Sequence, residues 1–163
     1  MEKLFVGKIV NTFGIKGELK VVSKFEMASK VYQKNNILFI GNKEYKISNV
    51  RFHKNNYLVE LDNIKDINLI EYLIGYDVYF NKDDLDLSDD EFLVSELVGY
   101  KVISNYKEVG VVNDYDDNKI NPLIKIDNKF YIPLNRYYDK IDKVNKILYV
   151  KDVSGLIKWE LQY

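Results

Sequence analysis

The residues that could do chemistry begin near the amino terminus, in residues 5–21, which read FVGKIVNTFGIKGELKV. Gly14 and Gly17 bracket Lys16 there, and glycine supplies the backbone freedom that a tight loop needs. The pattern predicts a strand, a loop that presents a lysine to an anion, and a second strand. It is neither a dinucleotide fingerprint nor a P-loop, because the glycines are too few and no Gly-Lys-Ser/Thr is present. A long hairpin with a solvated lysine fits the same spacing.

Positive charge is concentrated in the first half of the chain. Residues 1–82 hold 13 lysines and arginines against 9 acids, residues 83–91 hold six acids and no base, and residues 92–163 hold 11 against 10. Local excess, more than the net charge of −1, decides whether a surface attracts phosphate. The basic side chains expected to share the loop end of the first domain are Lys16, Lys20, Lys24, Arg51 and Lys54. Any one of them alone is better explained as a solvated side chain, and the group is stronger evidence than its members.

No catalytic residue, metal site or cofactor is predicted. The chain has no cysteine, which excludes disulfides, thiolate zinc sites and cysteine nucleophiles. The single imidazole, His53, falls in an expected exposed turn, and no serine elbow accompanies it. Residues 114–121 carry oxygens at alternate positions, but Lys119 and Lys125 stand where a calcium loop needs glycine and a bidentate glutamate. We therefore interpret this run as an acidic hairpin turn.

Short runs rich in β-branched and aromatic residues predict the strands that position these side chains. In the first half the expected strands are residues 4–10, 18–22, 37–40, 44–52, 57–61 and 76–80. Turn residues such as Gly41-Asn42 separate them, and one short helix is expected over residues 66–73, behind a possible Asp66 cap. This is the pattern of a small six-stranded barrel with one closing helix.

The acidic run 83–91 is the one abrupt change of composition, and it predicts a linker between domains 1–82 and 92–163. After it, residues 100–104, 108–114, 123–126, 130–132 and 147–150 predict a second barrel. The tail, residues 156–163, fits a helix or a strand equally well.

Arg136-Tyr137-Tyr138 combines residue types that are enriched at protein interfaces. A loop whose tyrosines cover the end of the barrel is the alternative.

The chain carries no sign of membrane insertion or export. No stretch approaches the roughly 20 apolar residues of a spanning helix, and the amino terminus lacks the apolar segment of a signal peptide. With 47% apolar and 30% charged residues, the chain is expected to fold. We therefore expect a cytoplasmic protein without membrane contact.

Three segments, in order and in spacing, resemble the RimM family of ribosome maturation factors. Residues 6–21 match its opening pattern V-G-x-I-x-x-x-x-G-x-x-G-E/D-x-x-V. Residues 92–102, FLVSELVGYKV, resemble the segment that opens the family's PRC barrel. Residues 131–134, 141–142, 147–150 and 155–156 are similar to its I-P, V-D, I-x-V and G-L ending. The resemblance covers nearly the whole chain.

This resemblance implies an all-β fold, with an N-terminal six-stranded barrel of the translation-factor type and a C-terminal PRC barrel. It implies a non-enzymatic assembly factor, expected as a monomer, that binds small-subunit ribosomal protein S19 and 16S rRNA in the head of the immature 30S subunit. The basic group named above would bind RNA. The residues expected to bind protein are Phe92, Leu93, Arg136, Tyr137 and Tyr138. No cofactor is implied.

Two departures from the family pattern bear on the sites. Phe13 stands where relatives commonly carry histidine, and Phe92-Leu93 stands where they often have Tyr-Tyr. The second change removes two hydroxyls, so a partner would be held there by packing. Two other functions remain open from sequence: an RNA-modifying enzyme, which would need a cofactor pocket or metal ligands, and a translation factor that acts on mature ribosomes.

Overall fold

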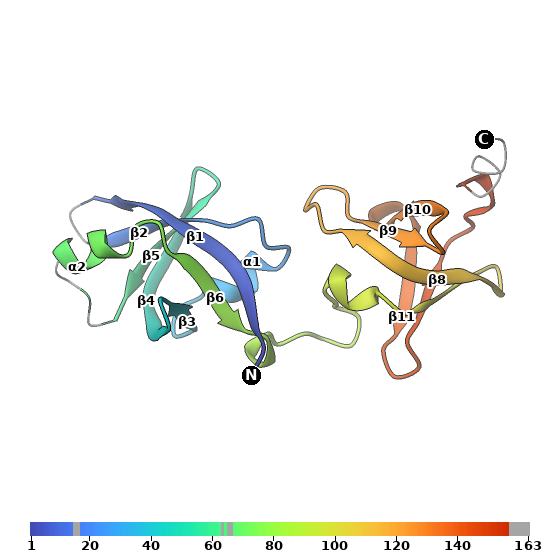
Figure 1. Ribbon diagram of the computed structural model, residues 1–163, viewed down its shortest axis with the longest axis horizontal. Helices are drawn as coiled ribbons and strands as arrows, with labels where there is room; N and C mark the ends of the chain where they lie inside the picture. The colour runs from blue at the N-terminus through green and yellow to red at the C-terminus, as the bar shows by residue number, and fades with distance from the viewer. Residues whose placement is uncertain (15–16, 63, 65–66, 157–163) are drawn as a thin grey trace. The chain divides into compact units, whose positions relative to one another are not determined.

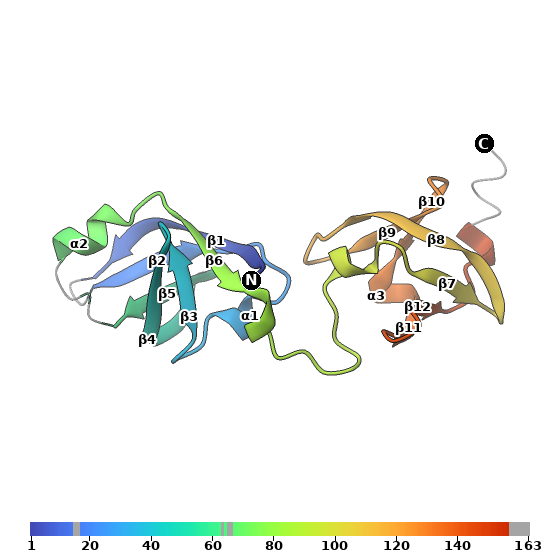
Figure 2. The ribbon, with the colours of Figure 1, turned by 60° about the horizontal axis from the view of Figure 1, so that its bottom comes forward.

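The computed structural model describes residues 1–14, 17–62, 64 and 67–156 and divides the chain into two compact units, Met1–Asp86 and Leu87–Tyr163. Figure 1 and Figure 2 show that strands dominate both units. The predicted all-β fold is confirmed. Among the described residues, no helix is long and apolar enough to cross a membrane.

The first unit is a closed six-stranded barrel, as predicted. Its strands are β1 (Lys3–Phe13), β2 (Glu18–Val22), β3 (Ile37–Ile40), β4 (Lys43–His53), β5 (Asn56–Leu61) and β6 (Asp77–Asn81), and its helices are α1 (Ala28–Val31) and α2 (Ile67–Tyr72). The strands follow one another around the barrel in the order β1-β2-β5-β4-β3-β6. The helix expected over residues 66–73 forms as α2, whereas α1 was not predicted because one turn leaves no helical periodicity to detect.

Closure of this barrel depends on β1, which pairs with β2 along one edge and with β6 along the other. The register with β6 shifts at Val6, between Phe5 and Gly7, and such a bulge bends a strand. The Val6 carbonyl accepts two hydrogen bonds at 2.6 Å, from the Ser23 hydroxyl and from the Tyr32 hydroxyl. Burial raises the pKa of Tyr32 above its ordinary value, so this hydroxyl keeps its proton.

Glycine at position 7 is required by this arrangement. A Cβ on Gly7 would collide with the Tyr32 hydroxyl and would lie 2.8 Å from Val21 Cγ1. Real Cβ atoms do not approach other atoms so closely, so any larger residue would displace the tyrosine or open the strand pair. The Val-Gly of the opening pattern is therefore explained by a close approach to a buried side chain.

The second unit is a six-stranded sheet in the order β10-β9-β8-β7-β12-β11. Its strands are β7 (Lys101–Ser104), β8 (Lys107–Asp116), β9 (Leu123–Ile126), β10 (Phe130–Pro133), β11 (Tyr138–Asp142) and β12 (Ile147–Val150). The short helix α3 (Leu134–Tyr137) and the 3-10 turn η2 (Val94–Leu97) accompany them. The long strand β8 pairs with β7 and then with β9, and residues from five strands and η2 share one core, as in a barrel.

One strand of this unit, β11, was not predicted from the sequence. Its residues Tyr138–Asp142 are mostly polar and lie at the edge of the sheet, with only β12 as a partner. An edge strand need not alternate apolar and polar residues, so periodicity does not reveal it. The predicted tail element lies mostly outside the described residues.

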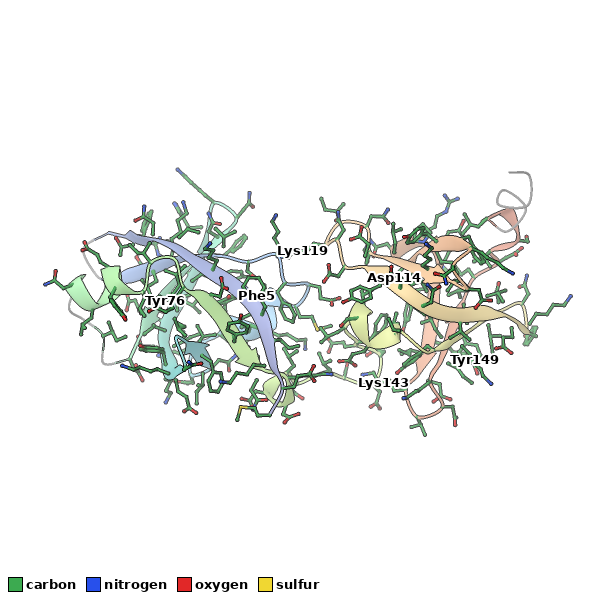
Figure 3. All side chains as sticks on the ribbon, in the orientation of Figure 1. Phe5, Tyr76, Asp114, Lys119, Lys143 and Tyr149 are labelled. Carbon is green, nitrogen blue, oxygen red and sulfur yellow. The ribbon has the colours of Figure 1, made fainter. Side chains whose placement is uncertain are left out.

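The acidic run is held by lysines on both sides of the division between the units. It begins with the 3-10 turn η1 (Lys82–Asp84), followed by the buried Leu85. Lys30 of the first unit donates a hydrogen bond to the Asp86 carbonyl at 3.0 Å. Lys143 of the second unit, which is labelled in Figure 3, donates to the Ser88 carbonyl at 3.0 Å. The division between the units therefore falls inside the run.

We expect limited proteolysis to cut first between Asp86 and Ser88, because exposed connections between compact units are cut before strands of a sheet. Each fragment should then give its own cooperative thermal transition. Mass spectrometry of the first cleavage products would check this expectation. A first cut within β1 to β6 would show that the two units do not fold separately.

Candidate functional site

An ion pair lies on the wall of the first barrel, between the start of β2 and the end of β4. The Arg51 guanidinium donates two hydrogen bonds to the Glu18 carboxylate, from Nε at 2.9 Å and from Nη2 at 3.0 Å. The Glu18 side chain is largely buried, while Arg51 is about half exposed. Hydrogen bonding to Glu18 raises the pKa of Arg51. Because the carboxylate neutralises it, Arg51 contributes little free positive charge to an approaching phosphate.

Phe13 links this ion pair to the only histidine. The Arg51 guanidinium lies 5.4 Å from the centre of the Phe13 ring, within the range of a cation–π contact. The His53 ring lies 5.3 Å from the same ring. Phe13 therefore contacts both Arg51 and His53.

The basic residues predicted from sequence do not meet at one loop end. Lys16 lies outside the described residues. Leu58 of β5 pairs with both Lys20 of β2 and Arg51 of β4, so those two side chains share a row across three strands. Lys54 lies in the turn between β4 and β5, and Lys24 follows β2.

The pairing of β2 with β5 explains why the group spreads out. The two strands are antiparallel, and Val21 pairs with Tyr57, so the β4–β5 turn lies at the end of β2 that leads to Lys24. Gly17 lies at the opposite end of β2, directly before its first residue. The described residues Lys20, Lys24, Arg51 and Lys54 therefore form a basic strip along β2, β5 and β4.

An aromatic hollow of about 380 Å³ borders this strip, and it was not predicted from the sequence. It is lined by Ser29, Tyr32, Val50, Arg51, Phe52 and Tyr57. Tyr32 and Tyr57 stack with their centroids 4.5 Å apart, and Phe52 lies 5.0 Å from Tyr57 at a tilt of 56°. Phe52 is 63% exposed, which is unusual for a phenylalanine on a folded barrel. Phe52 and Tyr57 flank the turn between β4 and β5. Two aromatic residues on either side of one turn were the feature of the sequence that could have indicated this hollow.

The residues predicted to bind protein lie in the second unit, and the structure brings most of them together. The rings of Phe92 and Tyr138 lie 5.5 Å apart, and both side chains pack partly buried against the core of the unit. The exposed guanidinium of Arg136 lies 5.7 Å from the Tyr137 ring. Leu93 differs, because it is only 2% exposed and so presents almost no surface to a partner. The prediction for the Phe92-Leu93 pair therefore rests on Phe92.

Comparison with known proteins decides the family. A family model of the RimM N-terminal domain matches residues 4–85. A ribosome maturation factor RimM of Staphylococcus aureus is 31% identical over 162 residues, which cover 93% of this chain and 97% of that protein. The chain belongs to the RimM family. A ribosome maturation factor RimM of Exiguobacterium sp. is 35% identical over 127 residues, 74% of this chain and 74% of that protein.

Two solved structures of RimM proteins are similar to this one. The N-terminal domain of RimM from Thermus thermophilus is 22% identical and covers 53% of this chain and 98% of that chain, with a TM-score of 0.46. A protein of Pseudomonas aeruginosa described as a 16S ribosomal RNA processing protein RimM is 19% identical and covers 94% of this chain and 99% of that chain, with a TM-score of 0.46.

A second glycine of the RimM opening pattern also has a structural reason. Gly17 has a φ of +80°, which side chains rarely adopt. A Cβ there would lie 2.7 Å from Cδ1 of Ile70, a buried residue of α2. Glycine at position 17 therefore allows the positive φ of the backbone and leaves room for α2 to pack against it.

We expect Arg51→Ala to destabilise this RimM-family chain, because it leaves the buried Glu18 carboxylate without its partner. Lys24→Ala, which removes an exposed charge from the same strip, is the matched control and should change stability much less. The midpoint of urea denaturation, followed by far-UV circular dichroism, checks the comparison. Equal midpoints for the two variants would mean that the ion pair contributes nothing measurable.

Proposed function

We propose that the chain is a non-enzymatic ribosome assembly factor that binds 16S rRNA and ribosomal protein S19 in the head of the immature 30S subunit and promotes its maturation. Membership of the RimM family carries the proposal, since relatives over nearly the full length are named ribosome maturation factors. The geometry supports it with two surfaces on separate units, the basic strip on the first and the Phe92–Tyr138 region on the second.

The basic strip would bind the RNA backbone. Lys24 and Lys54 are exposed and Lys20 is half-buried, and ammonium groups on flexible stems reach phosphates without strict geometry. Arg51 would act differently, because its guanidinium is already committed to Glu18. RNA binding by this strip would therefore depend on the lysines and weaken with salt.

The second unit would supply the protein contact. Phe92, Tyr137 and Tyr138 present partly buried rings beside the exposed Arg136, and Arg and Tyr are enriched where interfaces bind most strongly. The partner assigned to this surface is S19. Joining the two units in one chain makes the second contact intramolecular, so a monomer would bind the subunit more tightly than either unit alone. Such a factor would work in the cytoplasm, on free small subunits.

The RNA contact is tested by salt dependence. We expect the double substitution Lys20→Ala with Lys54→Ala to weaken binding to a 16S rRNA head fragment. It should also make the slope of log affinity against log salt shallower by about one to two units, because each lost phosphate contact removes roughly 0.7–0.9 units. Lys34→Ala with Lys43→Ala, two exposed lysines of the same barrel outside the strip, is the control. If both double variants keep the slope of the unaltered chain, the strip does not bind phosphate.

The protein contact is tested by substitution of two residues on the second unit. Phe92→Ala with Arg136→Ala should weaken binding to purified S19 at least tenfold, because truncation of central interface side chains commonly costs about 2 kcal/mol or more. Tyr106→Ala, which removes another exposed aromatic of this unit, should leave binding unchanged. Calorimetric titration measures the affinities, and the thermal transition shows whether the unit stays folded. Unchanged affinity in the folded double variant would show that this surface does not bind S19.

A further inference from the structure

The aromatic hollow beside the basic strip has the features of a site for a flat ring. Phe52, Tyr57 and Tyr32 form a ladder of three rings, in which the inner pair is stacked with a tilt of only 22°. Tyr32 and Tyr57 are sheltered, but Phe52 at the outer end is 63% exposed, so part of its ring is left for another molecule. An exposed aromatic face at a hollow of about 380 Å³ favours a planar, aromatic ligand that can stack on it.

The ladder is rigid before anything binds. The Tyr32 hydroxyl is fixed on the Val6 carbonyl at 2.6 Å, and its ring supports Tyr57. Arg51, which also lines the hollow, is fixed by two hydrogen bonds from its guanidinium to Glu18. A site whose walls are already fixed loses little conformational entropy on binding, so even a single stacked ring can contribute measurable affinity.

The charge around the hollow selects among aromatic ligands. Phe52 lies in β4 directly between Arg51 and His53, and the exposed Lys54 follows in the turn. Arg51, which lines the hollow, and Lys54, in the turn that joins Phe52 to Tyr57, thus supply the positive charge nearest the exposed ring. An aromatic group that carries negative charge on a flexible backbone satisfies both features, and a nucleotide of single-stranded RNA is such a group.

We propose that the aromatic hollow binds an unpaired base of single-stranded RNA, which stacks on Phe52 while Lys54 and Lys24 contact the flanking phosphates. The proposal rests on the RNA-binding function proposed above and adds that the strand is recognised by an unstacked base as well as by its charge. Stacking on an aromatic ring is tolerant of sequence, since every base has a flat face. Double-helical RNA, whose bases are stacked inside, would not use this site.

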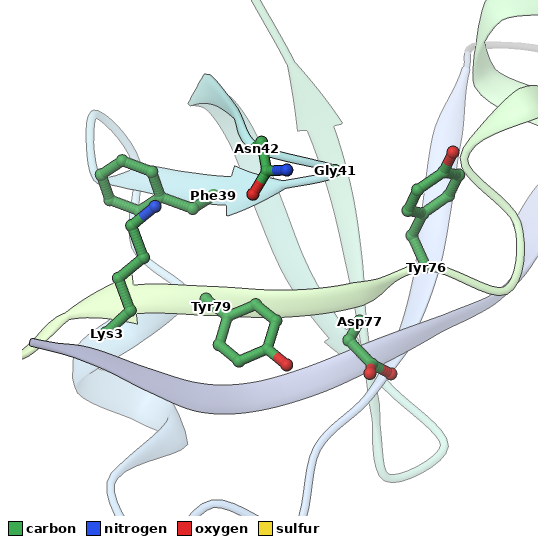
Figure 4. Close-up of a pocket in the computed structure, with 7 residues that line it drawn as sticks. All are labelled: Lys3, Phe39, Gly41, Asn42, Tyr76, Asp77 and Tyr79. Atoms are coloured by element: carbon green, nitrogen blue, oxygen red, sulfur yellow. The ribbon is translucent and has the colours of Figure 1, made fainter.

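A second hollow on the same barrel provides the control surface. It encloses about 450 Å³ and is lined by Lys3, Phe39, Gly41, Asn42, Tyr76, Asp77 and Tyr79 (Figure 4). Tyr79 lies between Lys3 and Asp77 in that view, so a positive and a negative side chain flank its ring (Figure 4). Phe5 of β1, labelled in Figure 3, meets Tyr79 edge-on with the centroids 5.9 Å apart. This surface is aromatic without an excess of positive charge, and Tyr79 is 37% exposed.

The test uses the full chain and a fluorescein-labelled single-stranded RNA of about ten nucleotides, a length typical of such sites. Phe52→Leu keeps apolar bulk but removes the ring, and should weaken binding between about 5-fold and 150-fold, the range for one stacked base. The slope of affinity against salt should stay as in the unaltered chain, because no charge is removed. Tyr79→Leu should bind as the unaltered chain does. Fluorescence anisotropy at several salt concentrations measures all three proteins.

An RNA of the same length with abasic residues separates stacking from charge. It should bind the unaltered chain and Phe52→Leu equally, and more weakly than normal RNA binds the unaltered chain. Equal binding of normal RNA to Phe52→Leu and to the unaltered chain would overturn the proposal. So would a loss of S19 binding in Phe52→Leu with RNA binding intact, since the ring would then serve a protein partner.

Crosslinking gives a second readout that needs no variant. RNA containing 4-thiouridine, irradiated on the unaltered chain, should attach to peptides that contain Phe52 or Tyr57; attachment confined to other peptides would overturn the proposal.

The failures of the two proposals are distinct. No RNA binding at all would remove the proposed RNA-binding function and this site with it. A salt slope that responds to the lysine substitutions, with no effect of Phe52→Leu, would remove only this site.

Discussion

The first barrel depends on the bulge at Val6, where β1 bends to pair with both of its neighbours. A closed sheet of six strands requires such bends, and each bend risks leaving a backbone group without a partner. A buried carbonyl that lost its partners would cost about 1–3 kcal/mol, a large share of the stability of a small domain. The hydroxyls of Ser23 and Tyr32 satisfy the Val6 carbonyl at 2.6 Å each. Gly7 makes this possible, because only glycine leaves room for the tyrosine.

The same tyrosine connects the closure of the barrel to its surface chemistry. Tyr32 is anchored at its hydroxyl, and its ring stacks at 4.5 Å on Tyr57, which in turn supports Phe52 at 5.0 Å. A requirement of folding therefore fixes the position of rings that reach the surface. This coupling separates two effects of substitution. A change at Tyr32 acts on folding and on the hollow together, whereas a change at the exposed Phe52 acts on the hollow alone.

Runs rich in β-branched and aromatic residues predicted most strands, and this signal failed where a strand is mostly polar. The bounds expected for β2 and β3 agree with the structure, whereas the polar edge strand β11 gave no signal. The candidate site was harder to predict, since it depends on which ends of the strands meet. Glu18 and Arg51 are 33 residues apart, and only the antiparallel pairing through β5 brings them together. The burial of Leu93 could not be predicted either, because neighbouring apolar residues look alike in sequence.

Arg51 shows why a count of basic residues is a poor guide to how RNA would be held. Its charge is balanced by Glu18 at 2.9 Å, so the strip has fewer free charges than residues. Affinity from a few lysines falls steeply at physiological salt, since each phosphate contact loses about 0.7–0.9 units of log affinity per tenfold rise in salt. Stacking carries no such dependence, because it displaces no counterions. A surface that combines three lysines with a supported ring can therefore hold a flexible strand at salt concentrations where the lysines alone would release it, despite a net charge of −1 for the whole chain.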